Sequence, residues 1–263
     1  MHDASQSEAQ LDAAQPRVWL VGAGPGDPEL LTLKAARLLA QAEVVLHDAL
    51  VSPAILALAP QARRVDVGKR CGRASAAQRF INRVLVTSAR RYRRVVRLKG
   101  GDPTIFGRLD EEMQALRAAG IAFEVVPGVT AACAAAAAIP VSLTLRGVAR
   151  SVSFVTPRRA GGEVDAGELE RLAADDGSLI VYMGGAQVAA AAQGLIAQGR
   201  AAATPLVIVE SASLPQQSVW RGSLRSARQW PGGQGGPVLL MIGAAFAAVG
   251  AADSASARLA CAA

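Results

Sequence analysis

Glycine, proline and acidic residues gather in four short segments that each follow an apolar run. The segments are residues 22–27, Asp48, residues 100–102 and residues 127–130. In open α/β sheets, ligands bind outside the carboxyl ends of the strands, so segments of this kind form binding loops when they converge. Glycine allows close backbone approach, and a carboxylate attracts a cation or accepts a proton. We therefore expect a small-molecule site at these strand ends.

The first of these loops matches part of a dinucleotide-binding fingerprint. Gly22 and Gly24 fit the start of Gly-x-Gly-x-x-Gly, and Asp48 lies about 20 residues further on, where that pattern has an acid. The third glycine is replaced by Asp27, and Pro25 has no amide hydrogen to donate. Because the loop offers few N–H groups to a pyrophosphate, a cofactor without a pyrophosphate fits better. An NAD-dependent oxidoreductase is the rival interpretation.

Several of these residues also have structural interpretations. Asp48 could cap a helix, Asp102 could serve only to hold its own loop, and Lys69 could be a solvated charge. Met183, at the end of an apolar run, is of a type usually found in a core. The basic run at residues 90–94 is typical of a solvated helix end, with contact to a substrate as the alternative.

Composition limits the class of protein. A chain of 263 residues with 51% hydrophobic and 19% charged residues predicts a well-buried core, divided between two modest α/β halves. The net charge of +7 implies an anionic partner. Aromatic residues are only 4% and are not interleaved with the arginines, so we expect a polyanionic small molecule rather than nucleic acid.

Metal, membrane and export signals are weak in this sequence. The three cysteines lie far apart and the chain has two histidines, so we expect no metal site. Residues 1–16 have neither a basic start nor an apolar centre, which predicts a cytoplasmic protein. The longest apolar helical run, residues 131–139, is far shorter than the roughly 20 residues of a membrane span.

The elements that must position the loops alternate between strand and helix. This alternation predicts the α/β class, with two α/β domains. We expect a disordered tail at 1–16, a parallel domain at 17–140, a hinge at 141–150, a second domain at 151–249 and a flexible tail at 250–263. In the second domain we expect strands at 152–156, 179–183, 206–210 and 238–242, and helices near 166–174 and 186–198. A turn after Trp220 and a return at residues 231–237 predict a mixed sheet there.

Longer motifs resemble the tetrapyrrole methylase family over about residues 17–249. Matching segments lie at residues 21–35, 47–52, 68–70, 95–108, 126–132 and 181–184, with Gln78, Ile81 and Asn82 between them. Several of these segments are long, and they follow one another in the family's order. The segment at 95–108, Val-Val-Arg-Leu-Lys-Gly-Gly-Asp-Pro-Thr-Ile-Phe-Gly-Arg, is the most specific of them.

The resemblance implies a class III methyltransferase that binds S-adenosylmethionine in a cleft between its two α/β domains. The product of the donor would be S-adenosylhomocysteine. The implied reaction is methylation of carbons 2 and 7 of uroporphyrinogen III to give precorrin-2. The implied cofactor contacts are Pro25, Gly100, Gly101, Asp102, Ile105, Thr130, Ala131, Met183 and Ala212. A sulfonium cofactor without phosphate agrees with the first loop.

The resemblance also implies roles in catalysis and substrate binding. Asp48 would be the general base, and Lys69 would be the acid or would steady an anion. Arg108, Glu111 and Arg146 would contact the substrate, whose carboxylates suit the basic chain. Family members are typically homodimers, so we expect a homodimer. We also expect a stand-alone methylase without a fused dehydrogenase and ferrochelatase portion.

Three departures from the family's usual motifs concern the fit of the substrate. Ala74 and Ser75 stand where many members have His-Ser, and residues 143–144 add two positions and remove a histidine before Arg146. Pro157 stands where many members have glycine. A sibling methylase that acts on a later corrin intermediate is therefore the alternative enzyme, and a non-catalytic cofactor-binding module is a third reading. The motifs do not decide between the sirohaem and cobalamin branches.

Overall fold

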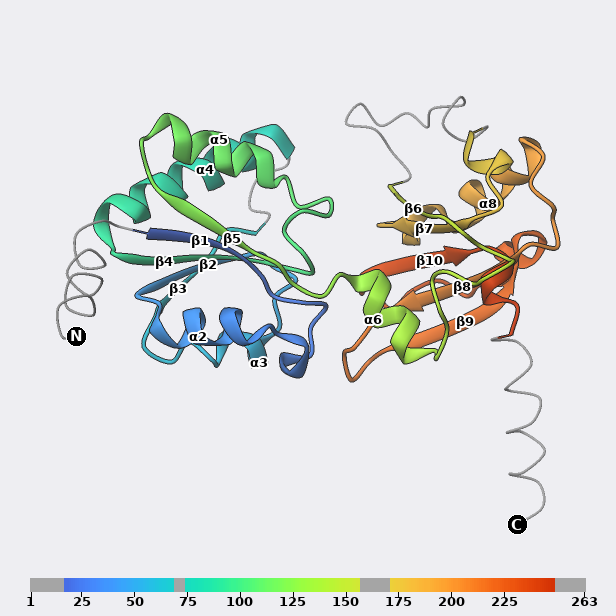
Figure 1. Cartoon of the computed structure of the whole chain (residues 1–263), viewed down its shortest axis with the longest axis horizontal. Helices are drawn as coiled ribbons and strands as arrows, with labels where there is room; N and C mark the ends of the chain where they lie inside the picture. Colours follow the sequence, from blue (N-terminus) through green and yellow to red (C-terminus); the bar gives the residue numbers. More distant parts are fainter. Residues whose placement is uncertain (1–16, 69–73, 157–170, 249–263) are drawn as a thin grey trace, which may run out of the picture. The chain divides into compact units, whose positions relative to one another are not determined.

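The protein consists of two compact units joined at Thr130 and Ala131. We describe it from a computed structural model, in which residues 17–68, 74–156 and 171–248 are placed (Figure 1). Unit 1 spans Met1–Thr130 and unit 2 spans Ala131–Ala263. Each unit contains one five-stranded sheet, so the expected α/β class with two α/β units is confirmed.

Unit 1 alternates strands and helices as the sequence predicted. Its strands are β1 (Arg17–Gly22), β2 (Val44–His47), β3 (Arg63–Asp66), β4 (Arg94–Lys99) and β5 (Phe123–Val126). Its helices are η1 (Pro28–Leu30), α2 (Leu33–Gln41), α3 (Pro53–Leu56), α4 (Ala74–Arg91) and α5 (Leu109–Ala118). Two of these helices have side-chain N-caps. Thr32 Oγ1 accepts a hydrogen bond from the amide of Ala35 at the start of α2, and Ser52 Oγ accepts one from the amide of Ile55 at the start of α3. Gly120, at φ +67°, follows the end of α5 in the expected position.

The sheet of unit 1 is parallel, in the order β3-β2-β4-β1-β5. Helices α2 and α3 cover one face of the sheet, and α4 and α5 cover the other (Figure 1). The apolar side chains of each face pack against the helices that cover it. Because α2 follows β1 and α5 follows β4, the chain leaves these two neighbouring strands toward opposite faces. Loops that diverge in this way leave a crevice at the carboxyl ends of the strands, which is where α/β proteins bind ligands.

Unit 2 contains the remaining elements. It begins with α6 (Ala131–Ala138), and its strands are β6 (Val152–Val155), β7 (Ser178–Tyr182), β8 (Pro205–Glu210), β9 (Ser218–Ser223) and β10 (Val238–Ile242). Its further helices are η2 (Gly185–Gln187), α8 (Val188–Ala197), η3 (Leu224–Gln229) and η4 (Ala244–Phe246). The helix expected near residues 166–174 lies largely outside the described residues, although residues 171–174 are helical.

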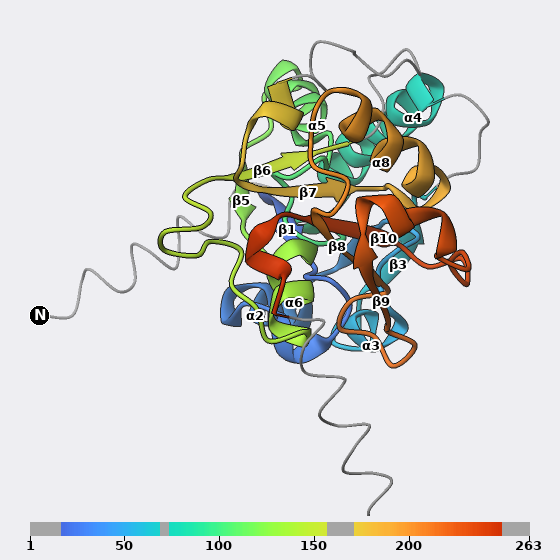
Figure 2. The ribbon, with the colours of Figure 1, turned by 90° about the vertical axis from the view of Figure 1, so that its right-hand side faces the viewer.

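The sheet of unit 2 is mixed, as predicted, in the order β6-β7-β10-β8-β9 (Figure 2). β10 is inserted antiparallel between β7 and β8, and β8 pairs antiparallel with β9. The prediction of a turn after Trp220 is wrong. Trp220 lies inside β9, opposite Ile208, and packs against the core, so the chain continues as a strand to Ser223.

The boundary between the units lies about ten residues before the predicted one, and residues 141–150 do not form a separate hinge. Ala132, Ala135 and Ile139 are buried with Val207 and Met241 of the second sheet, so α6 belongs to unit 2. Partly buried side chains of the following segment, Val141 and Leu143, pack against the same cluster. A helix of seven alanines and Cys133 carries no amphipathic pattern, so only its packing shows which sheet it covers.

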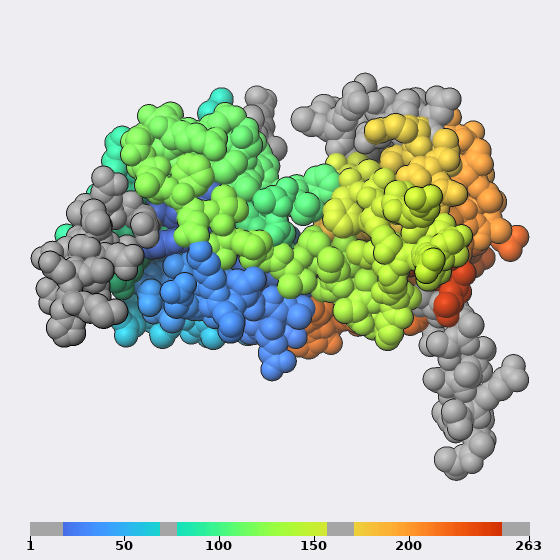
Figure 3. Space-filling view, viewed as in Figure 1, coloured from blue at the N-terminus to red at the C-terminus, as the bar shows by residue number. Residues whose placement is uncertain are grey.

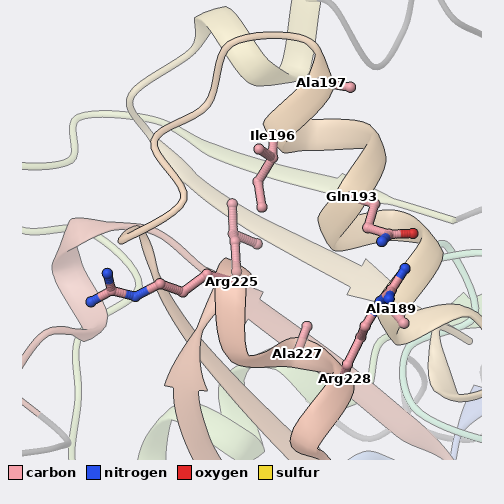
Figure 4. A pocket seen from close by; sticks show the side chains of 8 residues that line it. Ala189, Gln193, Ile196, Ala197, Arg225, Ala227 and Arg228 are labelled. Atoms are coloured by element: carbon pink, nitrogen blue, oxygen red, sulfur yellow. The ribbon is translucent and has the colours of Figure 1, made fainter.

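Neither the described helices nor the pocket of unit 2 adds a residue to the predicted site. Among the described residues, no helix is long and apolar enough to cross a membrane. Unit 2 carries a pocket of about 310 Å³ between α8 and η3, lined by alanine, isoleucine and leucine side chains together with Gln193, Arg225 and Arg228 (Figure 4). None of the residues that the sequence assigned to a site lines this pocket.

Candidate functional site

Three loops of unit 1 meet through their glycines at the carboxyl edge of the sheet. Gly22 ends β1, Gly101 follows β4 and Gly128 follows β5. A Cβ on Gly128 would lie 2.5 Å from the carbonyl oxygen of Gly101, and one on Gly22 would lie 2.7 Å from that oxygen. Gly24 and Gly101 also exchange backbone hydrogen bonds of 3.1 and 2.7 Å. The loops therefore pack backbone against backbone, at distances that no side chain would allow.

The opposite side of Gly101 is open. Gly101 has φ +69°, and a Cβ there would meet no atom of the described part of unit 1 within 4 Å. A Cβ on the neighbouring Gly100 would be 3.6 Å from the Cβ of Leu50, in the loop that follows Asp48. The glycine loops are thus closely packed against one another, and their exposed backbone borders open space. A ligand could contact the backbone closely in such a site.

Asp102 holds these loops together. Its Oδ2 accepts a hydrogen bond of 2.9 Å from the amide of Gly128, and its Oδ1 accepts from the amide and the hydroxyl of Thr104. The side chain therefore ties the loop after β4 to the loop after β5. Of the two roles considered for Asp102 from the sequence, the structure supports the loop-holding one, and a direct contact with a ligand stays a prediction.

We expect Asp102→Ala to lower the free energy of unfolding by about 1–3 kcal/mol, because the amides of Gly128 and Thr104 lose their acceptor. Urea denaturation measures this change. Asp66→Ala is the matched control, since within the described ranges Asp66 accepts from a single loop amide, that of Gly68, at 2.7 Å. A loss at Asp102 no larger than that at Asp66 would contradict the assigned role.

Asp48 lies at the end of β2 and is anchored by a buried arginine. Its Oδ1 is 2.6 Å from Nη2 of Arg97, whose side chain is only 2% exposed, while the side chain of Asp48 is 32% exposed. The Nε of Arg97 is 2.9 Å from Oε1 of Glu112, and Oε2 of Glu112 is 3.0 Å from Nζ of Lys99. Two cations and two carboxylates therefore form a chain of ion pairs that is buried except at Asp48.

Arg97, Lys99 and Glu112 were not predicted as site residues from the sequence. Arg97 and Lys99 alternate with Val96 and Leu98 along β4, and they face α5, which supplies Glu112. Both flanks of β4 are occupied by other strands, and charged side chains in such a buried strand are a signal of a polar network. That signal was present in the sequence.

The surroundings shift the pKa values of the two cations in opposite directions. Burial by itself lowers the pKa of Arg97, but the attraction of Glu112 and then of Asp48 outweighs it, so the pKa is raised above the ordinary value of an arginine. The pKa of Lys99 is lowered from 10.5, first by burial and then by repulsion from Arg97, with Glu112 opposing the shift. Arg97 is therefore a permanent buried cation beside Asp48.

Arg108 and Glu111 form a bidentate pair at the start of α5. Nε and Nη2 of Arg108 lie 2.7 and 2.8 Å from the two carboxylate oxygens of Glu111, and both side chains are more than a third exposed. Asn82 of α4 donates to the backbone oxygen of Glu111 at 3.1 Å, and Gln78 donates to Asn82 at 3.0 Å. The family motif residues of α4 thus support the start of α5.

In unit 2, strained backbone marks the ends of β7 and β8. Met183 follows β7 with φ +58°, and it is 65% exposed rather than part of the core. Ser211 and Ser213 flank Ala212 after β8 with φ +52° and +66°. Left-handed conformations are costly for residues other than glycine and cluster at functional sites. Met183 and Ala212, two predicted cofactor contacts, lie in these loops.

The remaining site predictions divide between the units. Pro25 and Ile105 lie in the loops after β1 and β4 and are half-buried, and Thr130 and Ala131 lie at the junction with α6. Arg146 is exposed in the turn of unit 2 closed by the bridge between Leu145 and Ala149. Lys69 and Pro157 lie outside the described residues, as does the side chain of Ala74. Among the described residues no three His, Cys, Asp or Glu side chains are grouped so that they could hold a metal ion.

Comparison with known proteins agrees with this arrangement. The sequence model of the tetrapyrrole (corrin/porphyrin) methylases matches residues 17–228. The chain belongs to this family. Because the match spans both units, the loops of unit 1 and those of β7 and β8 are parts of one methylase fold, and the membership favours a methylase over the dinucleotide-binding rival.

Relatives of this methylase include proteins of similar and of much greater length. The chain is 50% identical to the uroporphyrinogen-III C-methyltransferase of Pseudomonas aeruginosa over 208 residues, which are 79% of this chain and 84% of that protein. It is 46% identical to a siroheme synthase of a Psychrobacter species over 228 residues, or 85% of this chain and 47% of that protein. The methylase chain thus spans about half the length of the siroheme synthases that it matches.

Solved methylase structures share the fold. The uroporphyrin-III C-methyl transferase of Thermus thermophilus, crystallised with S-adenyl homocysteine, is 41% identical with a TM-score of 0.77, covering 88% of this chain and 98% of that one. A cobalt precorrin-4 methyltransferase is 27% identical with a TM-score of 0.76, covering 88% and 95%. Enzymes with different tetrapyrrole substrates therefore have this architecture.

Proposed function

We propose that the chain is an S-adenosylmethionine-dependent methyltransferase that methylates carbons 2 and 7 of uroporphyrinogen III to give precorrin-2. The main observation behind this proposal is the open carboxyl edge of the sheet in unit 1, which is formed by the glycine loops. There the loop of Gly100 lies next to the loop that follows Asp48. The 50% identity to the Pseudomonas aeruginosa uroporphyrinogen-III C-methyltransferase favours this substrate over a later corrin.

The residues present fit S-adenosylmethionine. Gly101 offers free space beside exposed backbone, and the first loop, with proline at position 25, offers few of the amide donors that a pyrophosphate requires. We assign the cofactor contacts to Pro25, Gly100, Gly101, Asp102, Ile105 and Thr130 of unit 1 and to Ala131, Met183 and Ala212 of unit 2. When bound, the cofactor supplies an activated methyl group for in-line displacement, a step that depends chiefly on positioning.

We assign the proton transfers to Asp48 and Lys69. A pyrrole carbon that accepts a methyl group must later release a proton, and the exposed part of the Asp48 carboxylate is available to receive it. Arg108, Glu111 and Arg146 are the proposed substrate contacts. Guanidinium groups pair with carboxylates in bidentate geometry, so Arg108 can exchange Glu111 for a carboxylate of the substrate.

Anaerobic turnover with uroporphyrinogen III and methyl-labelled S-adenosylmethionine tests the proposal. We expect two methyl groups on each product macrocycle, counted by mass spectrometry. Tight binding of S-adenosylmethionine without methylation of uroporphyrinogen III would reject this substrate and favour a sibling methylase. Failure to bind S-adenosylmethionine would contradict the methylase and the non-catalytic cofactor-binding module alike, and binding of a nicotinamide cofactor in its place would favour the dinucleotide-binding rival.

The remaining expectations concern the setting of the enzyme. We propose a cytoplasmic homodimer whose product enters sirohaem or cobalamin biosynthesis. The relatives named siroheme synthase favour the sirohaem branch. Light scattering of the purified protein measures the oligomeric state, and a monomer would contradict the proposal.

A further inference from the structure

The ion pairs beneath α5 are more extensive than the proposed chemistry requires. Of the four side chains in these ion pairs, only Asp48 has an assigned role in the reaction. The ion pairs continue from Asp48 into the interior through Arg97, Glu112 and Lys99, whose side chains are 2%, 0% and 3% exposed. Arg97 also donates to the carbonyl oxygens of Leu98 and Leu46, at 3.1 and 3.5 Å. The guanidinium is therefore held on three sides, by Glu112, by the backbone and by Asp48.

Stability alone does not explain this arrangement. The free energy needed to desolvate two ions is about as large as the free energy gained from their attraction. A protein in which well-packed apolar side chains replace a buried ion pair is often as stable as the original or more stable. The chain has one member that reaches solvent, and that member is Asp48. A rigid buried network that ends in one partly exposed carboxylate fixes the position of that carboxylate.

We propose that Glu112 is a positioning residue for the chemistry at Asp48, acting through Arg97, and that Lys99 balances its charge. This inference rests on the catalytic role proposed for Asp48. Glu112 binds Nε of Arg97 and so orients the fork that presents Nη2 to Asp48. Two cations face two carboxylates, so the network is neutral when Asp48 is ionised, and each change in a buried charge alters how readily Asp48 accepts a proton.

The charged and titratable groups around Asp48 come from each element packed against it. In the described part of the chain, β4 contributes Arg97 and Lys99, α5 contributes Glu112, and β2 contributes His47, whose Nδ1 is 3.1 Å from the backbone oxygen of Asp48. The neighbouring strand β3 contributes Asp66, which lies opposite His47 and accepts a hydrogen bond from the amide of Gly68. The polar side chains that α4 sends toward α5, Gln78 and Asn82, are uncharged. The fixed charges that can be varied are therefore Glu112 and Lys99.

A titration of the protein without ligands tests the network apart from the reaction. Carboxyl-carbon NMR of isotope-labelled aspartate follows Asp48, whose signal is identified by its loss in Asp48→Asn. We expect Glu112→Gln to move the titration midpoint to lower pH, because two cations then face one carboxylate, and Lys99→Met to move it to higher pH. Each shift should be about one pH unit, and the double variant should return the midpoint close to that of the parent.

Asp110→Asn is the matched control. Asp110 is exposed on the same helix, where it accepts a hydrogen bond from Gln114. Water and salt screen its charge, so the Asp48 midpoint should not move. If Glu112→Gln does not fold, Lys99→Met and the charge-balanced double variant still decide between the alternatives. A midpoint that is the same in all folded variants would overturn the proposal.

Turnover then tests the positioning role. We expect Glu112→Gln to lower kcat by about 10- to 100-fold while the affinity for S-adenosylhomocysteine is unchanged, because a displaced carboxylate slows the reaction without altering the cofactor loops. In an Asp48→Asn background the same change should cost little more. Equal losses in both backgrounds would show that Glu112 acts independently of Asp48. If the parent protein does not methylate uroporphyrinogen III, the proposed function fails, whereas the NMR shifts still report on the network.

Discussion

Asp48→Asn is expected to lower kcat for methylation of uroporphyrinogen III by about 10²- to 10⁴-fold, the contribution typical of a positioned acid or base. The amide oxygen of asparagine can still accept from Arg97, which lies 2.6 Å from Oδ1, so the fold and the position of the side chain are kept. What is lost is the ability of the exposed oxygen to take a proton. Single-turnover transfer of a labelled methyl group measures the effect directly.

The comparison variant for Asp48 is again Asp110→Asn, which makes the same chemical change on an exposed turn of α5. Figure 3 shows α5, in green, at the surface of unit 1. The Asp110→Asn variant should keep the turnover of the parent protein. Binding of S-adenosylhomocysteine should be the same in the two variants, because neither side chain contacts the glycine loops in the described structure. Parent-like turnover of Asp48→Asn would remove Asp48 from the mechanism.

Gly128→Ala should disrupt the cofactor loops. The new Cβ would lie 2.5 Å from the carbonyl oxygen of Gly101 and 2.9 Å from the Cα of Gly22, so the three loops have to separate. Because all of these atoms belong to the backbone, no side chain can move aside. We expect a loss of about 1–3 kcal/mol in the free energy of unfolding, as for other overpacked sites. Affinity for S-adenosylhomocysteine, measured by calorimetry, should fall by more than tenfold, since the loops that would hold it are displaced.

Gly120→Ala separates crowding from backbone strain. Gly120 has φ +67°, but a Cβ there would meet nothing within 4 Å among the described residues. Its replacement should cost about 1 kcal/mol through the left-handed conformation alone, and cofactor affinity should be unchanged. Equal losses of affinity in the two variants would contradict the role given to the glycine contacts.

Unit 1 follows closely from its sequence, and unit 2 less closely. Largely apolar runs followed by glycine or an acid marked the three central strands β1, β2 and β4, because central parallel strands are buried on both faces. The edge strand β3, Arg-Arg-Val-Asp, is mostly exposed and carries no such run. The alanine helix α6 was predicted as a helix but assigned to the first domain, and a turn was predicted after Trp220 where β9 continues to Ser223. A uniformly apolar helix has no face in its pattern, and Trp220 is held in β9 by its partner Ile208, 12 residues earlier in the chain.

The site was predicted at the level of loops rather than of contacts. Gly22, Gly101 and Gly128 were expected to lie near one another, since the carboxyl ends of parallel strands share one edge. That they pack against one another, and that Asp102 bonds to the amide of Gly128, depends on the order β4-β1-β5 in the sheet. Residues from neighbouring strands meet only once this order is known.

The sequence by itself determined the family, the kind of cofactor and the position of Asp48 at a strand end, because these follow from local motifs read along the chain. Tertiary structure alone decided what surrounds Asp48. Arg97 lies 49 residues beyond Asp48, and Glu112 lies 15 residues beyond Arg97. Their pairing requires β2 beside β4 and α5 packed over that face. Charged groups in a buried sheet must find partners, but the sheet order and the packed helix determine which ones they find.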